Sequence, residues 1–413
     1  MQTTQPRNAL YRNSSFLGIW LGEAASSLGA SFGTLANSWL LHRLTGSEAA
    51  LGNMWLIYLL PSLMVQLVIG PYLDRWNRKH IMLFSQLVRA IAFAFPLAMS
   101  LAGELVPWHL FLVSLLIGLI QPLYVPSSLA MLPSLIKKQQ LPQANATIDG
   151  TTRFMMFLGP PVGGLLVALI GAELTLLVVI TMYAASFVFL CYCQYVPQPT
   201  LPRDTWARQL KEGFRYFWGH QQLVWLGIFL SFVQFAVGVT MVLNLPYVVD
   251  ELHGTSVLYG MFLASYPLGY FLGSLLVPRI QLRLPLRQVM LGSLLLGGSS
   301  FLMLAIVENI WFALAIELFA GITAPFFHVH STSLYQRVVP AELQGRVFSV
   351  RLLIIRSVMP LGTLLGSYGA EVGGIRPVLA LVGTMVCVAA ILGMVLPWFR
   401  FLGREQNGTL ADS

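Results

Sequence analysis

The chain has 413 residues and a formal net charge of +8; 56% of its residues are hydrophobic and only 10% are charged. At a mean hydropathy of +0.73 there are too few polar residues to cover a water-exposed surface, which excludes a soluble multidomain enzyme. The basic residues are spread over separate short segments between apolar stretches, so the positive surplus does not indicate a nucleic-acid-binding patch.

Twelve apolar stretches follow one another along the chain, and each is long enough to cross a bilayer, which takes about 20 helical residues. The sequence therefore predicts an all-α membrane protein with twelve transmembrane helices in two six-helix bundles. The first six helices are expected at residues 14–41, 50–73, 80–101, 106–136, 142–170 and 173–195. The second six are expected at residues 221–249, 256–279, 286–307, 310–338, 344–370 and 374–400.

The first predicted helix carries two separate stripes of side chains. The small-residue stripe, which suits close helix packing, consists of Gly18, Gly22, Ala25, Gly29, Gly33 and Ala36. The polar stripe consists of Glu23, Ser27, Thr34, Asn37 and Ser38. A carboxylate at bilayer depth costs about 3 kcal/mol, so Glu23 needs a partner or water. We expect Glu23 to bind protons or a cationic substrate; the alternative is a structural acid paired with a neighbouring arginine.

The polar segment after the second helix has a distinctive set of residues, namely Gly70, Asp74, Arg75, Arg78 and Lys79. Asp74, at a helix end, can accept hydrogen bonds from a basic group or lie against the positive N-terminus of another helix. The natural opposite point is the start of the eleventh helix, at Gly345 and Arg346. We therefore expect a latch that closes the cytoplasmic side; the alternative is that these charges only anchor the topology.

The fifth predicted helix holds an ion-pair spacing and a glycine-rich stretch. Asp149 and Arg153 are four residues apart, which fits an intrahelical ion pair, although Asp149 could instead exchange Arg153 for a proton during a transport cycle. Further along, Pro160 is expected to bend the helix, and three glycines are expected to let neighbouring backbones approach, namely Gly159, Gly163 and Gly164. The stretch therefore predicts close packing with a hinge.

A linker at residues 197–220 separates an N-terminal bundle, residues 1–196, from a C-terminal bundle, residues 221–413. Its apolar residues recur at helical spacing and are Trp206, Leu210, Phe214 and Phe217. This amphipathic cytoplasmic helix is expected to lie on the inner leaflet; the alternative is an ordinary surface helix packed on the bundles.

The tenth predicted helix carries Glu317 and His328, which are eleven residues apart and therefore lie on one face. Arg356, in the eleventh helix, is expected at about the same depth as His328. Because histidine titrates near neutral pH, these three residues could relay protons, or they could be satisfied structural groups. His328 and His330 point apart on a helix, so no metal site is expected.

The chain is internally duplicated. A shift of 203 residues superposes Gly118 on Gly321, Pro122 on Pro325, Arg153 on Arg356, Gly159 on Gly362 and Gly163 on Gly366. Six helices per copy give both copies the same polarity, so the bundles are expected to be related by a pseudo-two-fold axis along the membrane normal, with a cavity between them. The residues expected to line that cavity, or alternatively to pack in the core, are Trp20, Asn37, Gln121, Tyr124, Gln234, Phe235, Asn244, Tyr247, Phe326 and Phe327.

The basic residues sort to alternate connections between the helices, and this sets the orientation. With a cytoplasmic N-terminus, only Arg43 and Arg376 fall on the outer side among the basic residues that flank the predicted helices. The chain is therefore expected to be a multi-pass protein of a bacterial plasma (inner) membrane, with both termini in the cytoplasm.

Several of these motifs resemble those of a known family. Residues 70–79 are similar to the loop signature of the major facilitator superfamily, and residues 159–164 resemble its antiporter motif. Further segments resemble the drug:proton antiporter branch, which includes macrolide efflux pumps and enterobactin-type siderophore exporters; they are residues 44–47, 131–146, 210–217 and 340–348. The resemblance implies that the glycine-rich motif helps to determine export rather than import, although packing alone would also explain it. Ala30 stands where that branch often has an acid, so proton coupling through that position is excluded.

We therefore expect a proton-coupled secondary active exporter of amphipathic or hydrophobic small molecules that works by alternating access. Two alternatives stay open: a dedicated siderophore exporter or lysolipid flippase, and a non-transporting sensor on a transporter fold. The sequence has no nucleophile with an adjacent base, no metal cluster and no phosphate-cradling loop, so neither an enzyme nor a cofactor is expected. The expected partners are a small-molecule substrate, protons and the lipid bilayer, without nucleic acid, and the protein is expected to be monomeric.

Overall fold

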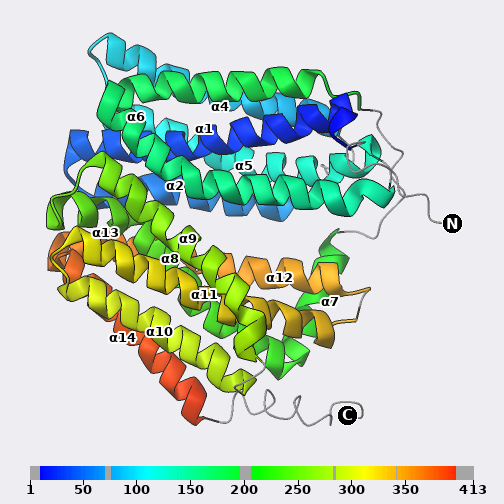
Figure 1. Cartoon of the computed structure of the whole chain (residues 1–413), viewed down its shortest axis with the longest axis vertical. Helices are drawn as coiled ribbons and strands as arrows, with labels where there is room; N and C mark the ends of the chain where they lie inside the picture. Colours follow the sequence, from blue (N-terminus) through cyan, green and yellow to red (C-terminus); the bar gives the residue numbers. More distant parts are fainter. Residues whose placement is uncertain are drawn as a thin grey trace. The chain divides into compact units, whose positions relative to one another are not determined.

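The computed structural model describes residues 10–69, 76–136, 138–195, 206–281, 285–340 and 342–396. These residues are almost entirely helical (Figure 1). They divide into two compact units. The first unit comprises Met1–Gly46, Asn53–Arg203 and Thr255–Gly260, and the second comprises Ser47–Gly52, Asp204–Gly254 and Met261–Ser413.

The first unit is built mainly from five long helices. They are α1 (Ser14–Thr45), α2 (Glu48–Val68), α4 (Arg78–Leu101), α5 (Pro107–Leu135) and α6 (Leu141–Cys191). Within this unit α6 packs along α1 and α4, and α4 packs along α5 (Figure 1). The Asn13 side chain caps α1 by accepting hydrogen bonds from the backbone N–H groups of Ser15 and Phe16, which would otherwise be unsatisfied.

Helix α6 is too long for one crossing, and it is broken at Gly171, whose φ of 84° and ψ of 159° are not helical. The break falls where the sequence predicts the connection between the fifth and sixth helices. Since φ and ψ at Gly171 lie in a region that is essentially restricted to glycine, the residue type itself permits the chain to turn here.

The second unit contains most of the remaining long helices, while the first turn of α9 belongs to the first unit. They are α7 (Trp206–Gly219), α8 (Gln221–Pro246) with a π-helical turn (Tyr247–Glu251), α9 (Ser256–Gln281), α10 (Leu286–Ile306), α11 (Ile310–Val338), α12 (Gln344–Ser357), α13 (Met359–Gly373) and α14 (Ile375–Val395). The single helix expected at residues 344–370 is interrupted at Val358 and forms α12 and α13. Pro360 explains the interruption, because proline lacks the N–H that a continuous helix needs.

Ten helical stretches in the described part of the chain are long and apolar enough to cross a membrane. One of them is the whole of α6, and another joins α12 to α13. Helix α1 is not among the ten, in keeping with its glycine and serine residues and Glu23, which lower its mean hydropathy. The protein is therefore a multi-pass helical membrane protein, while twelve crossings remain a prediction.

The small-residue stripe predicted in the first helix does pack closely, as expected. A β-carbon at Gly18 would lie 2.7 Å from the Phe189 carbonyl oxygen of α6, and one at Gly29 would lie 3.2 Å from Met182. A β-carbon at Gly33 would meet the Phe93 ring of α4 at 2.6 Å. Any larger residue at these positions would push the helices apart, so the stripe determines how close α1 comes to its neighbours.

Candidate functional site

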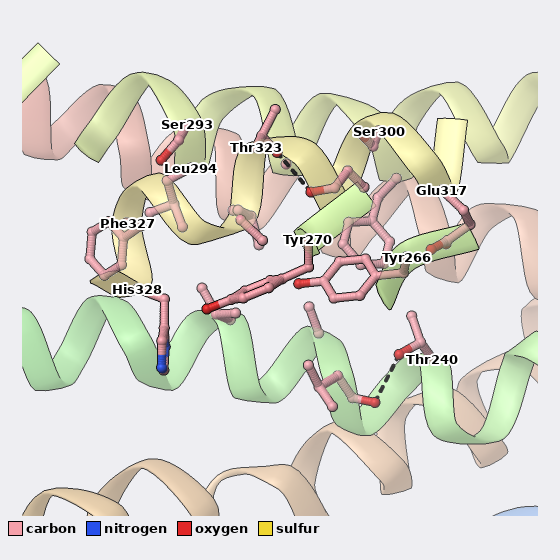
Figure 2. A pocket seen from close by; sticks show the side chains of 18 of the residues that line it. Thr240, Tyr266, Tyr270, Ser293, Leu294, Ser300, Glu317, Thr323, Phe327 and His328 are labelled. Carbon is pink, nitrogen blue, oxygen red and sulfur yellow. Dashed lines mark hydrogen bonds between the residues drawn. The ribbon is translucent and has the colours of Figure 1, made fainter. Parts of the chain in front are cut away.

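A cavity of about 430 Å³ lies within the second unit, between α8, α9, α10, α11 and α14. Its lining is mostly apolar and aromatic, with a few polar side chains (Figure 2). Five residues that the sequence analysis singled out line it, namely Gln234, Asn244, Glu317, Phe327 and His328. This combination of an apolar wall with few polar groups is typical of small-molecule sites.

Glu317 is the most unusual group in this cavity. It is only 9% exposed and lies on α11, a helix apolar enough to cross the membrane. Its carboxylate makes no hydrogen bond or ion pair with any residue that the structure describes. Tyr266 lies at the same end of the cavity (Figure 2).

His328 lines the other end of the same cavity, where its ring centroid lies 6.5 Å from that of Tyr270. The predicted shared face of Glu317 and His328 on α11 is thus confirmed (Figure 2). Arg356 is exposed on α12 and does not line the cavity, so two members of the predicted Glu-His-Arg set share this cavity. His330 is buried and also lies outside the lining residues.

The first unit has a buried polar network centred on Arg89 of α4. Its guanidinium donates hydrogen bonds to Ser26 Oγ at 3.0 Å and to Gln121 Oε1 at 2.7 Å. The same group lies 4.6 Å from the ring centroid of Tyr124, a cation–π contact. The sequence identifies Arg89 as a charge inside a predicted helix but gives it no role, because its partners lie on other helices.

Glu23 lies at the edge of this network. It is half-buried, and its Oε2 accepts a hydrogen bond from Ser128 Oγ at 3.2 Å. Arg89 is near enough to act on Glu23 electrostatically, yet the two form no ion pair. The structure therefore places Glu23 near an arginine, as the structural alternative expected, with its carboxylate close to the hydroxyl groups of Ser128 and Tyr124 rather than in an ion pair.

Asp149 and Arg153 form the intrahelical ion pair that their spacing suggests, with Arg153 Nε 2.8 Å from Asp149 Oδ2. Both side chains are well exposed, at 64% and 67%. Two residues after Asp149, Thr151 accepts a hydrogen bond from Trp20 Nε1 at 2.8 Å. Trp20 therefore joins α1 to α6 through its indole group.

Three residues of the predicted cytoplasmic latch, Gly70, Asp74 and Arg75, lie outside the described residues. The other two in that segment bind helix ends of the first unit. Arg78 donates to the Ala130 carbonyl at 2.8 Å, and Lys79 donates to the Cys191 and Cys193 carbonyls at 2.8 and 2.7 Å. These cations satisfy carbonyl groups near the C-terminal ends of α5 and α6, where a positive charge is favoured.

The other side of the predicted latch consists of Gly345 and Arg346. Arg346 forms an ion pair with Glu212 of α7. Glu212 also pairs with Arg208 at 3.3 Å. A β-carbon at Gly213 would lie 2.7 Å from the Arg346 carbonyl, so α7 packs tightly on α12, whereas Gly345 has open space around it. The linker helix therefore packs on α12 of its own unit, as the surface-helix alternative expects, while its position on the inner leaflet stays a prediction.

The glycine-rich stretch of α6 is packed tightly against residues of neighbouring helices. A β-carbon at Gly163 would lie 3.1 Å from Phe32 of α1, and one at Gly159 would collide with Ser31. The Gly164 carbonyl accepts a hydrogen bond from Ser256 Oγ at 3.0 Å, within the first unit, and Pro160 lies in the same part of α6. The predicted close packing is confirmed; a role in transport direction is a separate proposal.

The other residues expected to line a central cavity lie mostly in packed surroundings. Asn37 is buried and donates to Ser114 at 3.2 Å, and Tyr247 is buried and donates to the Leu304 carbonyl at 2.7 Å. Phe326 belongs to a buried cluster with Val277 and Val289. Phe235 is half-buried and its backbone contacts Gly362. These positions serve packing within their own units, and none of them lines the cavity of Figure 2.

Sequence reasoning assigned no role to Arg351, another buried cation. It lies on α12 with its guanidinium 4.2 Å from the Tyr335 ring centroid and within 3.3 Å of Ser331 Oγ. No motif signals this arrangement, because the aromatic ring and the hydroxyl come from α11, some twenty residues earlier.

Comparison with known proteins places this architecture among transporters. A family model described as "Transmembrane secretion effector" matches residues 7–405. The chain is 25% identical to macrolide efflux protein A of Streptococcus pyogenes, covering 92% of this chain and 95% of that protein. It is 23% identical to the multidrug efflux pump Tap of Mycobacterium tuberculosis, covering 95% of each. Among solved structures, a bacterial homologue of the iron transporter ferroportin has a TM-score of 0.76 at 16% identity, covering 94% of this chain and all of that one.

Proposed function

Because the chain belongs to the transmembrane secretion effector family of major facilitator superfamily transporters, we propose that it is a proton-coupled exporter of amphipathic or hydrophobic small molecules. It is a transporter rather than an enzyme, since its relatives and structural neighbours are transporters. The export direction and the substrate class rest on its likeness, over more than nine-tenths of the chain, to two efflux proteins.

Proton coupling needs a group inside a membrane-spanning helix that can gain and lose a proton. Glu23 and Glu317 supply two carboxyls of this kind, and neither is locked in an ion pair with a described residue. Tyr124 and Arg89 face Glu23, whereas Tyr247 and Tyr266 face Glu317. We assign the coupling role first to Glu23 and extend it to Glu317 and His328. Asp149, Arg153 and Arg356 are secondary candidates, since these three are exposed.

The proposed mechanism is alternating access between two six-helix bundles, residues 1–196 and 221–413, joined by a linker at 197–220. Equivalent glycines support the duplication. Gly171 and Gly374, which are 203 residues apart, share φ of 84° and have ψ of 159° and 161°. In this scheme Gly70, Asp74, Arg75, Gly345 and Arg346 close the cytoplasmic side, and the α6 glycine motif favours export.

The proposed location is the plasma (inner) membrane of a bacterium, with both termini in the cytoplasm, and the proposed functional unit is a monomer. Its partners in this scheme are the substrate, protons and the bilayer. The lipid-facing surface is supported by exposed large apolar residues along the spans, such as Leu169, Ile306 and Val395.

The test is flux of a panel of fluorescent amphipathic compounds into inside-out membrane vesicles, with and without a pH gradient. We expect gradient-dependent uptake by the wild-type protein and its loss in Glu23→Gln, because the amide cannot carry a proton. Glu104→Gln serves as the matched control and should retain most of the flux, since this exposed acid lies in the connection between α4 and α5. Binding of these compounds without any flux would favour a sensor, and gradient-driven flux through Glu23→Gln would refute the coupling assignment.

A further inference from the structure

The cavity of the second unit holds a carboxyl group that no described part of the chain neutralises. Glu317 lines it with nine-tenths of its surface buried and without a hydrogen-bond partner among the described residues. Two groups that could have been partners of Glu317 are bound to other residues. Arg376 pairs with Glu251 at 2.6 Å, and Tyr247 donates its hydroxyl hydrogen to the Leu304 carbonyl. Burying a carboxylate without a partner costs free energy, and a ligand that enters the cavity could supply the missing partner.

The surroundings of Glu317 suit an apolar body with one positive charge. The rings of Tyr266, Phe301 and Phe327 lie along the cavity, and aromatic faces attract cations. Thr240 and other polar groups of α8 line the opposite wall (Figure 2). The cavity of about 430 Å³ is within the range of about 300 to 1,000 Å³ that holds drug-sized ligands.

The cavity is also elongated along α11. Glu317 and His328 mark its two ends (Figure 2), and eleven residues of helix correspond to about 16 Å. Of the described residues that line it, Glu317 is the sole carboxylate, and none is a lysine or an arginine. An anionic ligand would therefore meet a negative charge with no lysine or arginine among the described lining residues to offset it.

We propose that this cavity binds an elongated amphiphile carrying a single positively charged amine, with the amine against Glu317 and the apolar body extended along the aromatic rings toward His328. This inference rests on the proposed export function and names the chemical class of its substrate. It assigns recognition to a site inside one unit, formed by α8, α9, α10, α11 and α14.

The test uses two fluorescent probes that differ only in their head group, a trimethylammonium and its neutral tert-butyl isostere, bound to the purified full-length protein. A quaternary ammonium cannot exchange a proton, so its binding reports the Glu317 charge independently of proton coupling. We expect Glu317→Gln to weaken binding of the ammonium probe by about tenfold or more, and to leave the neutral probe unchanged. Glu317→Asp should retain part of the difference in affinity between the ammonium and the neutral probe. The exposed Glu371→Gln in α13 should retain all of that difference.

A second variant tests the site without touching the acid. Thr240→Phe fills the cavity from α8, and it should exclude both probes while the protein unfolds at the wild-type temperature. Equal loss of both probes in Glu317→Gln, or unchanged binding of both in Thr240→Phe, would overturn the proposal. Glu317-dependent binding of the ammonium probe, with no flux of any compound of the panel into the vesicles, would leave this site standing and refute the export function instead.

Discussion

Two buried charges, Arg89 and Glu317, have contrasting surroundings. In the first unit Arg89 binds Ser26, Gln86 and Gln121 and stacks on Tyr124, so its charge is dispersed over several neutral groups. In the second unit Glu317 faces an apolar cavity without any such partner in the described part of the chain. A satisfied charge stabilises a fold, whereas an unsatisfied one is available to a proton or a ligand.

Arg89→Ala should destabilise the first unit strongly. The substitution leaves buried acceptors on α1 and α5 unpaired and removes the positive charge beside Glu23. We expect the free energy of unfolding to fall by about 3 kcal/mol, measured by thermal or denaturant unfolding of the purified protein. Arg208→Ala, which removes an exposed pair with Glu212, should cost less than about 1 kcal/mol. Equal effects of the two substitutions would contradict the structural role given to Arg89.

At the level of helices, two glycines allow turns that other residues resist. Gly171 breaks α6, and Gly374 separates α13 from α14, both with φ of 84°. Alanine at either position should lower the free energy of unfolding by about 1 to 3 kcal/mol, because this backbone region is essentially closed to side chains. Gly150→Ala is the control: it lies inside α6 with open space around it, and it should raise stability by up to about 1 kcal/mol.

Each unit also has an ion pair that ties together two of its helix ends. Arg43 at the end of α1 pairs with Glu173 of α6, while Glu251 after α8 pairs with Arg376 of α14 at 2.6 Å. Glu173 and Arg376 are 203 residues apart, and their partners Arg43 and Glu251 lie near the ends of α1 and α8, the first long helix of each predicted half. Each half therefore has an ion pair between these helix ends, with the signs of the charges exchanged.

The opposite order of the charges in the two pairs predicts that the acid and the base of the Glu251–Arg376 pair can be exchanged with little loss of stability. Arg376→Glu alone should lower the free energy of unfolding by about 1 kcal/mol or more, because it brings like charges together in a partly buried site. The double variant Glu251→Arg with Arg376→Glu should recover most of that loss. A double variant as unstable as the single one, in the same unfolding assay, would mean that the neighbouring groups, including the Ala305 carbonyl bound by Arg376, require the native order.

Considered as a whole, the molecule repeats its packing as well as its sequence. Gly118 of α5 meets the backbone of Tyr58 in α2, and its counterpart Gly321 of α11 meets the backbone of Tyr266 in α9. Gly163 likewise packs on α1, and its counterpart Gly366 packs on Val239 of α8. Equivalent helices therefore touch at equivalent glycines in the two units, which supports the proposed six-plus-six duplication.

This duplication makes a prediction about topology. With six crossings per half, both ends of the chain should lie in the cytoplasm. A C-terminal green fluorescent protein should therefore fluoresce, and a C-terminal alkaline phosphatase, which is active only outside the cytoplasm, should be inactive. A phosphatase fused after Glu104, in the connection between α4 and α5, should be active as the control. Activity of both phosphatase fusions would place Glu104 and the C-terminus on the same side of the membrane, which implies an even number of crossings between them and rules out two equivalent bundles.

Much of the fold could be predicted from sequence because the relevant properties are local. Apolar length predicted most helix positions to within a few residues, and the small-residue stripe of residues 14–41 predicted the packed face of α1. The break between the fifth and sixth helices was recognisable at Gly171. The interruption at Val358 was missed, since Pro360 within a continuous apolar stretch was interpreted as part of one span.

The sequence by itself thus determined that this is a multi-pass helical membrane protein, with Glu317 and His328 on one helix face, because hydrophobic length and helical spacing are properties of neighbouring residues. Only the tertiary structure decided which charges have partners. Arg89 reaches Gln121 on another helix, Arg346 pairs with Glu212 of the linker, and Arg356 lies outside the cavity that His328 lines. The physical reason is that a side chain's partners depend on which distant helices meet and on how each is rotated about its axis, and no local pattern specifies either.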